Sequence, residues 1–536
     1  MTVGDMAEVL KNRGLLKAGS ADEIIDKKNT EKRKMEELKW LTCDSRRVVP
    51  GTLFICKGAA FRPEYLQQAV DQGCIAYISE QRVKVKGAAA ALIVSDIRKA
   101  MAVASAAFFR YEPGKPILTG ITGTKGKTTT AWFLKAMLDE WEKEKGGRET
   151  GLISTVENFD GKTHEDAVMT TPEAPVIHEM LANARENGVS YLTMEVSSQA
   201  LKYRRVKELK FQVGIFLNIS EDHISPSEHE DFEDYFSAKL SLFRQTKTAC
   251  INLDSDYREQ IQIAAKRAER VVTFGKNPGA DIRYSAVRIE RGRISFRVTC
   301  DRFTQRFHLG MKGRFNIENA MAAIAAAYVY GVPVSCMQRA LEQTKVPGRM
   351  ETFYSEDKII CGVVDFAHNR LSFEKLFDAV CREYGEYTKI ITVFGCPGGK
   401  ALNRRRELGI LAGRFSDFVC ITSDDPGMEC QEEIAREVQS YVEMTGCPCK
   451  SIADRREAIR YAASLAGKSG EKTLILALGR GCEKFQKIGK SAYAYPTDSQ
   501  MMGEILLSSS TPPAYLPRDA RSEGAFTCAP LRSAGG

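Results

Sequence analysis

The chain has 536 residues, 43% of them hydrophobic, and a formal net charge of +8. This length predicts about three domains with ordinary buried cores, and the mild positive charge favours small anionic substrates over nucleic acid. The N-terminal segment lacks the apolar core of a signal peptide, and no apolar run is long enough to span a bilayer. Because 15 cysteines are scattered along a chain without a secretion signal, we expect a reducing, cytoplasmic location.

Short strand-like and helix-like segments fill the region from Leu41 to about Arg110, among them GTLFICKG and YLQQAVDQGCIAYISE. They predict a small α/β domain, which we place at residues 1–113. The Pro- and Gly-containing stretch YEPGKP at 111–116 marks its end.

The second region, residues 114–346, alternates five apolar runs with helical patterns, which is typical of a largely parallel sheet covered by helices. The runs are ILTGIT, SYLTMEV, QVGIFLN, TACINLD and RVVTFG. After a Pro-Gly break, four further runs predict another α/β domain at residues 347–507: IICGVVDF, KIITVFG, FVCITSDD and TLILALG. The tail at 508–536 is rich in Ser, Pro, Ala and Gly and is predicted to be disordered.

The strongest local signal is the segment GITGTKGKTTT at residues 120–130, between an apolar strand and a helical pattern. Glycines allow the backbone N–H groups to turn toward phosphate oxygens, and the helix N-terminus adds a favourable dipole. Lys127 is then expected to reach the β- and γ-phosphates, and the Thr128 hydroxyl to ligate Mg²⁺. Neither Gly120 nor Gly123 stands where the first glycine of the standard P-loop belongs, so the loop is a variant of it.

Three further residues are candidates for a metal site near this loop. Glu195 ends a strand-like run, and His223 follows the next run beside Asp222. Lys239, in YFSAKLSLF, binds a metal only if it is converted to a carbamate, which supplies oxygen ligands. On sequence alone, Glu195 fits a solvated strand-end carboxylate and His223 a packed or surface histidine equally well, and composition favours a helix-surface lysine for Lys239.

Ten segments occur in the order seen in the Mur ligase family, which the chain resembles from about Leu41 to Asp498. They are GTKGKTTT, MEVSSQAL, LNISEDH, YFSAKLSLF, GRFNIENAMAA, VPGRME, VVDFAHN, VFGCPGG, TSDDP and GRGCEKFQ. The N-terminal DSRRVVPGTLFICKG is similar to the uridine-nucleotide domain of the members that add the third residue of the peptidoglycan stem peptide. The resemblance implies three α/β domains, with a central P-loop-type, mostly parallel sheet and a C-terminal Rossmann-like domain, in a cytoplasmic monomer.

The resemblance also implies ATP- and Mg²⁺-dependent formation of an amide bond through an acyl phosphate. Thr128 and Glu195 would hold one Mg²⁺, and His223 with carbamylated Lys239 the other. Asn319 would lie at the adenine, Arg349 at the phosphates and Asp365 at the ribose. The loop residues expected to bind ATP are Gly123, Thr124, Lys125, Gly126, Lys127, Thr128 and Thr129.

The implied acceptor is a UDP-N-acetylmuramoyl dipeptide, and the second substrate is a diamino acid. Ser45 and Arg46 match the contacts to the nucleotide. The residues that match contacts to the muramoyl peptide are Thr170, Thr171, Ser197 and Arg205. Without the resemblance, the TTPE segment predicts a helix N-terminus with Thr171 as its cap.

The resemblance places Asp424, Gly479 and Glu483 at the incoming amino acid. Diaminopimelate-adding members carry Asp-Asn-Pro-Arg, whose guanidinium pairs with the distal carboxylate of that substrate. Here the loop is Asp-Asp-Pro-Gly at 424–427, which lacks a cation and favours the ammonium of L-lysine. Meso-diaminopimelate stays an alternative, because three nearby cations could replace the missing arginine: Lys400, Arg404 and Arg405.

Other departures from the family pattern are Gln199 in place of a histidine, Gly399–Lys400 in place of an acid–arginine pair, and GRGCE in place of GKGHE. Three rival interpretations remain: a ligase similar to folylpolyglutamate synthase, a P-loop NTPase that binds without ligation, and a non-catalytic paralogue. The segments DSRRVVPG and MTTPEAP count against the first. Gly114 and Gly348 are the expected hinges between domains.

Overall fold

The computed structural model describes residues 1–17, 34–58, 61–87, 89–222, 224–225, 228–290, 292–399 and 402–507. The predicted disordered tail, His223 and Lys400 lie outside these described residues. Internal contacts divide the chain into two compact units. Unit 1 comprises 1–285, 298–305 and 318–341, and unit 2 comprises 286–297, 306–317 and 342–536. The three-domain boundaries at 113/114 and 346/347 stay predictions.

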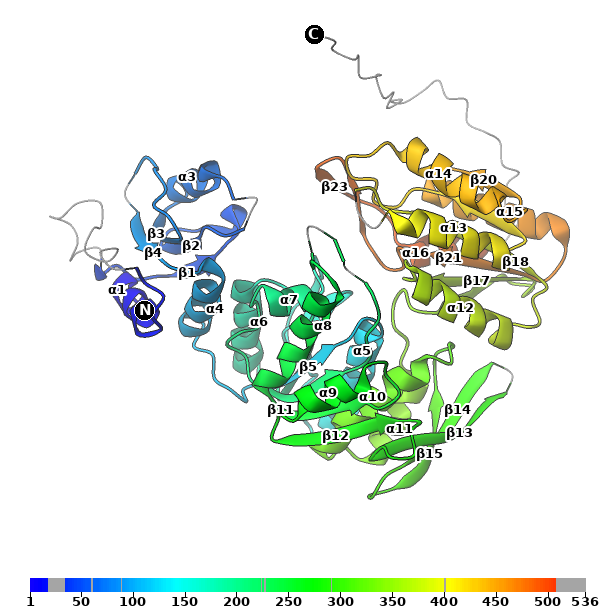
Figure 1. The fold of residues 1–536 in the computed structure, drawn as a ribbon, viewed down its shortest axis with the longest axis horizontal. Coiled ribbons are helices and arrows are strands. Elements are labelled where there is room, and N and C mark those ends of the chain that lie inside the picture. Colours follow the sequence, from blue (N-terminus) through cyan, green and yellow to red (C-terminus); the bar gives the residue numbers. More distant parts are fainter. Residues whose placement is uncertain are drawn as a thin grey trace, which may run out of the picture. The chain divides into compact units, whose positions relative to one another are not determined.

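The N-terminal part of unit 1 is a small sheet of four parallel strands in sequential order (Figure 1). Its strands are β1 (Trp40–Thr42), β2 (Thr52–Ile55), β3 (Cys74–Ser79) and β4 (Ala90–Ile93). Its helices are α1 (Val3–Asn12), the short 3₁₀ helix η1 (Ser45–Arg47), α3 (Pro63–Asp71) and α4 (Ile97–Phe108). The apolar side chains of α1 and α4 form one core with the strands, as the alternation of apolar segments predicts.

The central sheet has the strand order β15-β14-β13-β12-β11-β10-β5-β9-β6-β7-β8. The run from β12 to β6 is parallel, and β7 and β8 add antiparallel pairs at one edge. The strands on one side are β5 (Ile117–Thr122), β6 (Gly151–Ile153), β7 (Glu157–Phe159), β8 (His164–Asp166) and β9 (Tyr191–Glu195). The strands on the other side are β10 (Phe211–Phe216), β11 (Thr246–Asn252), β12 (Arg270–Gly275), β13 (Ile282–Glu290), β14 (Arg293–Thr299) and β15 (Thr304–Leu309).

Strand β5 lies in the middle of this sheet, between β9 and β10, at the point where the chain changes direction across the sheet. Ligands bind at such switch points, outside the carboxyl ends of the strands. The connecting helices are α5 (Lys127–Glu144), α6 (Ala174–Glu186), α7 (Ser198–Lys202), α8 (Phe232–Leu240), η2 (Ser241–Gln245), α9 (Arg258–Ala265), α10 (Asn316–Tyr330) and α11 (Val334–Gln343). The loop after β5 therefore occupies the position at which a ligand is expected.

Unit 2 contains a six-stranded sheet in the order β16-β17-β21-β18-β19-β20, parallel except for the β16–β17 pair. Its strands are β16 (Glu351–Tyr354), β17 (Ile360–Asp365), β18 (Lys389–Phe394), β19 (Phe418–Ile421), β20 (Cys449–Ser451) and β21 (Thr473–Leu478). A separate antiparallel hairpin pairs β22 (Phe485–Ile488) with β23 (Ser491–Ala494). The helices are α12 (Arg370–Glu383), α13 (Asn403–Phe415), α14 (Gln431–Glu443), α15 (Arg455–Ser469) and α16 (Asp498–Leu507).

Two apolar clusters cover the two faces of the unit 2 sheet. Side chains from α12, α13 and α14 pack on one face, and side chains from α15 and α16 pack on the other. The strands between them are almost entirely buried, which explains their continuous apolar sequences.

The nine apolar runs singled out in the sequence all form strands, namely β5, β9, β10, β11, β12, β17, β18, β19 and β21. The predicted α/β class with a mostly parallel central sheet is confirmed. In the parts of the chain that the structure describes, no helix combines the length and the apolar character needed to cross a membrane.

Candidate active site

The loop between β5 and α5 is fastened to the end of β10. The backbone N–H of Thr124 donates to the carbonyl of Asn218 at 3.0 Å, and that of Lys125 donates to the Asn218 side chain at 2.9 Å. The Thr124 hydroxyl accepts from the N–H of Ser220 at 3.1 Å and shares a hydrogen bond of 3.0 Å with the Tyr235 hydroxyl. The loop is thus held in one conformation before any ligand binds.

Two glycines in this loop are required by its geometry. Gly123 and Gly126 both have positive φ angles, at 151° and 86°. A Cβ on Gly126 would lie 2.1 Å from Oδ1 of Asn319, and one on Gly123 would lie 2.8 Å from Cβ of Leu217. Only glycine fits both positions. Asn319, which the resemblance places at the adenine of ATP, therefore lies directly against Gly126 of this loop.

One carbonyl oxygen in the loop accepts hydrogen bonds from two lysines. Lys127 Nζ donates to the carbonyl of Gly123 at 3.0 Å, and Lys239 Nζ donates to the same oxygen at 2.9 Å. Lys125 lies nearby and forms an ion pair of 3.3 Å with Asp222. Three lysine side chains are therefore gathered around one turn of backbone, an arrangement that suits an anionic ligand.

Lys239 differs from the surface lysine that its sequence suggested as the simpler interpretation. It lies in the last turn of α8 and only 1% of its surface is exposed. Its Nζ also lies 4.6 Å from the ring centroid of Tyr235. Burial lowers the pKa of the Lys239 ammonium well below its usual range, and the neighbouring Lys127 lowers it further. Burial therefore favours the neutral amine form of this side chain.

Glu195 ends β9 and is buried beside the loop after β6. Its Oε1 accepts the backbone N–H of Thr155 at 2.8 Å, and its carbonyl accepts the Thr171 hydroxyl at 2.9 Å. Thr171 in turn accepts the N–H of Ser197 at 3.0 Å, while Thr170 bonds the Thr155 hydroxyl at 3.2 Å. The predicted metal ligand and three predicted peptide-binding residues thus form one continuous hydrogen-bonded cluster.

Arg205, the fourth predicted peptide-binding residue, joins the same cluster. It donates to the carbonyl of Thr171 at 3.0 Å and pairs with Glu173 at 3.0 Å. Glu173 also pairs with Lys57 of the N-terminal sheet at 2.5 Å. The helix that follows begins at Ala174 with Glu173 as its N-cap residue. The simpler interpretation of TTPE, with Thr171 as the cap, is therefore wrong, because the Thr171 hydroxyl bonds to Glu195 and Ser197 instead.

Ser45 and Arg46, the predicted nucleotide contacts, lie in η1 on the N-terminal sheet. The Ser45 hydroxyl donates to Gln68 at 3.0 Å, and the Arg46 guanidinium forms a two-point ion pair with Asp44, its closest contact being 2.7 Å. The Arg46 side chain is 84% exposed. Both side chains lie away from the core, where a ligand can reach them.

Asp365 and Arg349 lie together in unit 2. The Asp365 carboxylate accepts the N–H groups of Met350 at 2.9 Å and Ala367 at 2.8 Å. The Arg349 guanidinium lies 4.6 Å from the ring centroid of Phe366 and donates to the carbonyl of Gly348 at 3.0 Å. The proposed hinge residue Gly348 packs tightly, because a Cβ there would lie 2.6 Å from the N atom of Cys482.

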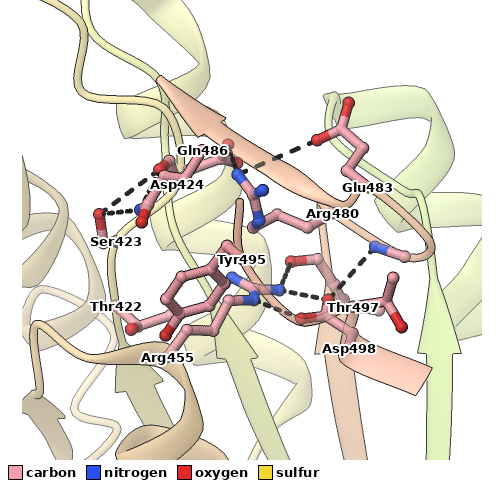
Figure 2. Close-up of polar contacts among 12 residues, drawn as sticks. Thr422, Ser423, Asp424, Arg455, Arg480, Glu483, Gln486, Tyr495, Thr497 and Asp498 are labelled. Carbon is pink, nitrogen blue, oxygen red and sulfur yellow. Dashed lines mark hydrogen bonds and ion pairs between the residues drawn. The ribbon is translucent and has the colours of Figure 1, made fainter. Parts of the chain in front are cut away.

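The predicted amine-binding acids surround a buried arginine (Figure 2). Arg480, 1% of whose side chain is exposed, follows β21 and pairs with Asp425 at 3.0 Å, Asp424 at 3.7 Å and Glu483 at 4.0 Å. A Cβ on Gly479 would lie 3.3 Å from Oδ2 of Asp424. Asp424, Gly479 and Glu483, predicted as one set, are thus brought together. The arginine at their centre was not predicted.

Arg405, one of the cations offered as a substitute for the missing arginine, is already engaged. Its guanidinium pairs with Glu429 at 2.5 Å and Glu437 at 2.7 Å, and only 8% of the side chain is exposed. Glu429 also accepts the N–H of Gly399, which fixes the preceding loop. Arg405 therefore stabilises the loop that contains Gly399, through Glu429.

Comparison with known proteins places this arrangement in a family. Residues 121–327 match the Mur ligase middle domain, and residues 348–481 match the Mur ligase, glutamate ligase domain. The UDP-N-acetylmuramoyl-L-alanyl-D-glutamate–L-lysine ligase of Enterococcus faecalis is 37% identical over 86% of this chain and 90% of its own length. The UDP-N-acetylmuramyl-tripeptide synthetase of Lactobacillus acidophilus is 34% identical over 93% and 96%.

The chain belongs to the Mur ligase family. It is an ATP-dependent ligase. Among solved structures, the MurF ligase of Thermotoga maritima in complex with ADP is similar in fold, with a TM-score of 0.59 and 18% identity over 88% of this chain and 97% of the other. The resemblance noted in the sequence is thereby confirmed.

Sequence reasoning did not identify three residues that organise the sites of this Mur ligase. Tyr235 contacts both the phosphate loop and Lys239, and its position four residues before that lysine on one helix was the available signal. Arg480 stands in GRGCE, which was noted as a departure and then left without a role. His229 is buried between Ser198 at 3.0 Å and Asp234 at 2.9 Å, and nothing in its sequence context distinguished it.

Proposed function

We propose that this Mur ligase joins L-lysine to the γ-carboxylate of the D-glutamate in UDP-N-acetylmuramoyl-L-alanyl-D-glutamate, with conversion of ATP to ADP and phosphate. The observation that carries the choice of lysine is the cluster around Arg480. Three carboxylates there lie within 4.0 Å of a single buried guanidinium, so acids outnumber the cation in this set of contacts. Such a cluster attracts an ammonium group and repels a second carboxylate.

The reaction makes an unreactive acid electrophilic in two steps. An oxygen of the D-glutamate γ-carboxylate attacks the γ-phosphorus of ATP, the bond to the β-phosphate oxygen breaks, and ADP leaves. The α-amine of lysine then attacks the acyl carbon of the resulting acyl phosphate. The amine loses a proton, the carbon–oxygen bond to phosphate breaks, and inorganic phosphate leaves as the amide forms. The first step develops charge on the transferred phosphoryl group, which positive side chains stabilise.

The phosphate loop is the proposed site of the triphosphate. Lys127, at the start of α5, would exchange its hydrogen bond to the Gly123 carbonyl for contacts with the β- and γ-phosphates, because a lysine side chain is long and flexible. The N–H groups of Lys127 and Thr128, in the first turn of α5, are proposed to bind the same anion. Asn319 lies against Gly126 and is proposed to contact the adenine, while Arg349 and Asp365 keep their proposed roles at the phosphates and the ribose.

The residues at the ends of β5, β9 and α8 suit Mg²⁺. Thr128 and Glu195 supply hydroxyl and carboxylate oxygens, the ligands this ion prefers, and both side chains are nearly buried. Mg²⁺ bound with ATP neutralises charge on the phosphoryl oxygens. His223 is proposed as a further ligand from sequence alone, because it lies outside the described residues.

Lys239 is proposed to carry a carbamate. Burial favours the neutral form of its amine, the form that can attack carbon dioxide with formation of a carbon–nitrogen bond and release of a proton. The product is an anion with two oxygen ligands. Lys127, which shares the Gly123 carbonyl with Lys239, supplies a positive charge beside that anion. Burial of an anion is favourable only with such partners, so the surroundings fit a carbamate better than an ammonium.

The muramoyl dipeptide is proposed to bind along the cluster of Thr170, Thr171, Ser197 and Arg205, with its uridine nucleotide at Ser45 and Arg46. Arg205 is the cation of this set that is suited to a substrate carboxylate, because its guanidinium already spans Thr171 and Glu173. Intracellular nucleotide substrates of this kind place the enzyme in the cytoplasm. Its proposed products are the UDP-linked tripeptide, ADP and phosphate.

The proposal is tested by ligation with the UDP-linked dipeptide and ATP, with L-lysine and meso-diaminopimelate offered in parallel. We expect phosphate release that requires both the dipeptide and L-lysine, and a product whose mass is the dipeptide plus one lysyl residue. The ratio of kcat/KM should favour L-lysine by about 100-fold or more. A larger kcat/KM for meso-diaminopimelate would overturn the choice of amine. Phosphate release without any amine would overturn ligation itself.

A further inference from the structure

The two acids of the sequence Asp424–Asp425 have different environments, although they are neighbours. Asp425 Oδ1 accepts from the Arg480 guanidinium at 3.0 Å and from the N–H of Lys487 at 3.0 Å. Asp424 lies farther from the same guanidinium, at 3.7 Å, and Glu483 lies at 4.0 Å. Asp425 is therefore bonded to Arg480 at short distance, whereas Asp424 and Glu483 form longer ion-pair contacts with the same guanidinium.

Arg480 itself is held on several sides. Its Nη2 donates to the carbonyl of Phe485 at 2.5 Å, in strand β22. The next residue, Gln486, donates to the Ser423 hydroxyl at 2.7 Å and to the Asp424 carbonyl at 2.6 Å. The hairpin is thus joined to the 423–427 loop by side-chain and backbone bonds, and Arg480 lies between them (Figure 2).

The base of the Arg480 loop is fixed by a second buried arginine. Arg455 forms a two-point ion pair with Asp498, at 2.6 and 2.7 Å, and donates to the carbonyl of Leu478 at 2.7 Å. Asp498 also accepts the N–H of Gly481 at 3.2 Å. The residues on both sides of Arg480 are therefore anchored, so its guanidinium has little freedom to follow a moving carboxylate.

From this geometry we infer that Arg480 is a positioning residue for amine selection, which uses Asp425 as its anchor and holds Asp424 and Glu483 apart at the spacing that receives the lysine ammonium. The inference rests on the proposed function. Arg480 acts through the acids, because its buried guanidinium is enclosed by protein groups. A planar guanidinium can contact three carboxylates at fixed angles, which a lysine ammonium at this position cannot do.

An electrostatic role and a positioning role of Arg480 predict opposite changes in the KM for L-lysine when its guanidinium is removed. If the cluster attracts lysine by charge alone, Arg480→Met removes the positive charge that contacts the three carboxylates and lowers the KM for L-lysine. If Arg480 positions the acids, the KM rises although the cluster becomes more acidic. This contrast separates the inference from a general electrostatic effect.

The test compares wild type, Arg480→Lys, Arg480→Met and Asp425→Asn, with Arg382→Met as the matched control. Arg382 is an exposed arginine on α12 whose guanidinium pairs with Asp378 at 2.8 Å, outside the cluster. We expect the KM for L-lysine to rise about tenfold or more in the three cluster variants, with kcat and the KM values for ATP and the dipeptide within about twofold of wild type. The control should match wild type in every constant.

A double-mutant cycle between positions 480 and 425 gives the second measurement. Because the two residues act as one unit, Arg480→Lys combined with Asp425→Asn should raise the KM for L-lysine little more than either change alone. Arg480→Lys keeps the charge, so it serves if Arg480→Met does not fold. An unchanged or lower KM for L-lysine in folded Arg480→Lys overturns the inference. Failure of wild type to use L-lysine at all overturns the proposed function instead.

Discussion

Gly126 tolerates less change than any neighbouring loop position, because two constraints meet there. Its φ of 86° disfavours other residues, and the Asn319 amide occupies the space of a side chain. We expect Gly126→Ala to raise the KM for ATP about tenfold, since Asn319 must move from the loop. The control is Gly146→Ala, at a φ of 69° with nothing within 4 Å of the new Cβ. Backbone strain of about 1 kcal/mol is common to both variants. A difference between their steady-state KM values for ATP therefore reports the clash with Asn319.

Replacement of Lys239 should change activity and stability in different ways. Replacing it with methionine removes the amine that would carry a carbamate, and we expect the rate of ligation to fall at least about 100-fold. The same change removes a buried polar group and leaves a side chain of similar size, so the melting temperature should stay equal or rise. Lys247→Met, at an exposed position in β11, is the control. Full activity in Lys239→Met, measured by phosphate release, would exclude the carbamate.

At the scale of elements, the Arg455–Asp498 pair connects the starts of α15 and α16 to the end of β21. Both side chains are almost completely buried. Asp498→Ala leaves an unpaired guanidinium in the core and should lower the free energy of unfolding by about 3–5 kcal/mol. Arg455→Met combined with Asp498→Leu should be less destabilising than Asp498→Ala, because no charge is left unpaired. Urea unfolding followed by circular dichroism measures both.

The exposed pair Arg370–Glu374 on α12 provides the comparison for this prediction. Its two side chains are four residues apart on one helix and are 65% and 40% exposed. Glu374→Ala should change the free energy of unfolding by less than about 0.5 kcal/mol. Equal losses in Glu374→Ala and Asp498→Ala would show that the buried pair does not hold these elements together.

Sequence patterns predicted the buried parallel strands well and the short or exposed strands poorly. The nine apolar runs are visible because both faces of their strands are covered. Strands β6, β7 and β8 have three residues each, too few to show a period. In β14, buried positions alternate with partly or fully exposed ones along RISFRVT, a period of two that predicts a strand with one covered face.

The residues of the candidate site also differ in whether the sequence alone could predict their surroundings. The phosphate loop could be predicted because its residues are consecutive. The burial of Lys239 could not, since its partner Gly123 lies 116 residues away in the sequence. Arg480 and Asp425 are likewise 55 residues apart, and only folding brings them together. Local chemistry was therefore predicted from the residues, while pairing between distant segments required the structure.

At the scale of the whole molecule, acid should weaken unit 1 through His178. This side chain lies in α6, with neither ring nitrogen hydrogen-bonded to any described residue, and burial lowers its pKa from 6.5 to about 3. The unfolded chain binds a proton below pH 6.5 that the folded chain does not. The contribution of His178 to the free energy of unfolding is therefore fully present above pH 6.5, and it is lost as the pH falls from 6.5 toward 3.

We expect this residue to account for a loss of about 2 kcal/mol in the free energy of unfolding between pH 7.5 and pH 5. His178→Phe removes the titrating ring and should reduce the acid sensitivity by that amount, as urea titrations at both pH values would reveal. The control is His164→Phe, since the His164 side chain is 53% exposed. An identical pH dependence in wild type and His178→Phe would contradict the assignment.

The division of the chain into two units has a spectroscopic consequence. All three tryptophans, Trp40, Trp132 and Trp141, belong to unit 1. A chain with two compact units need not unfold in one step, and indole emission reports only the half that carries the phosphate loop. A melting curve recorded by tryptophan fluorescence thus does not report the unfolding of unit 2. A single tryptophan introduced there, on the exposed surface of α12 for example, would give each half its own signal.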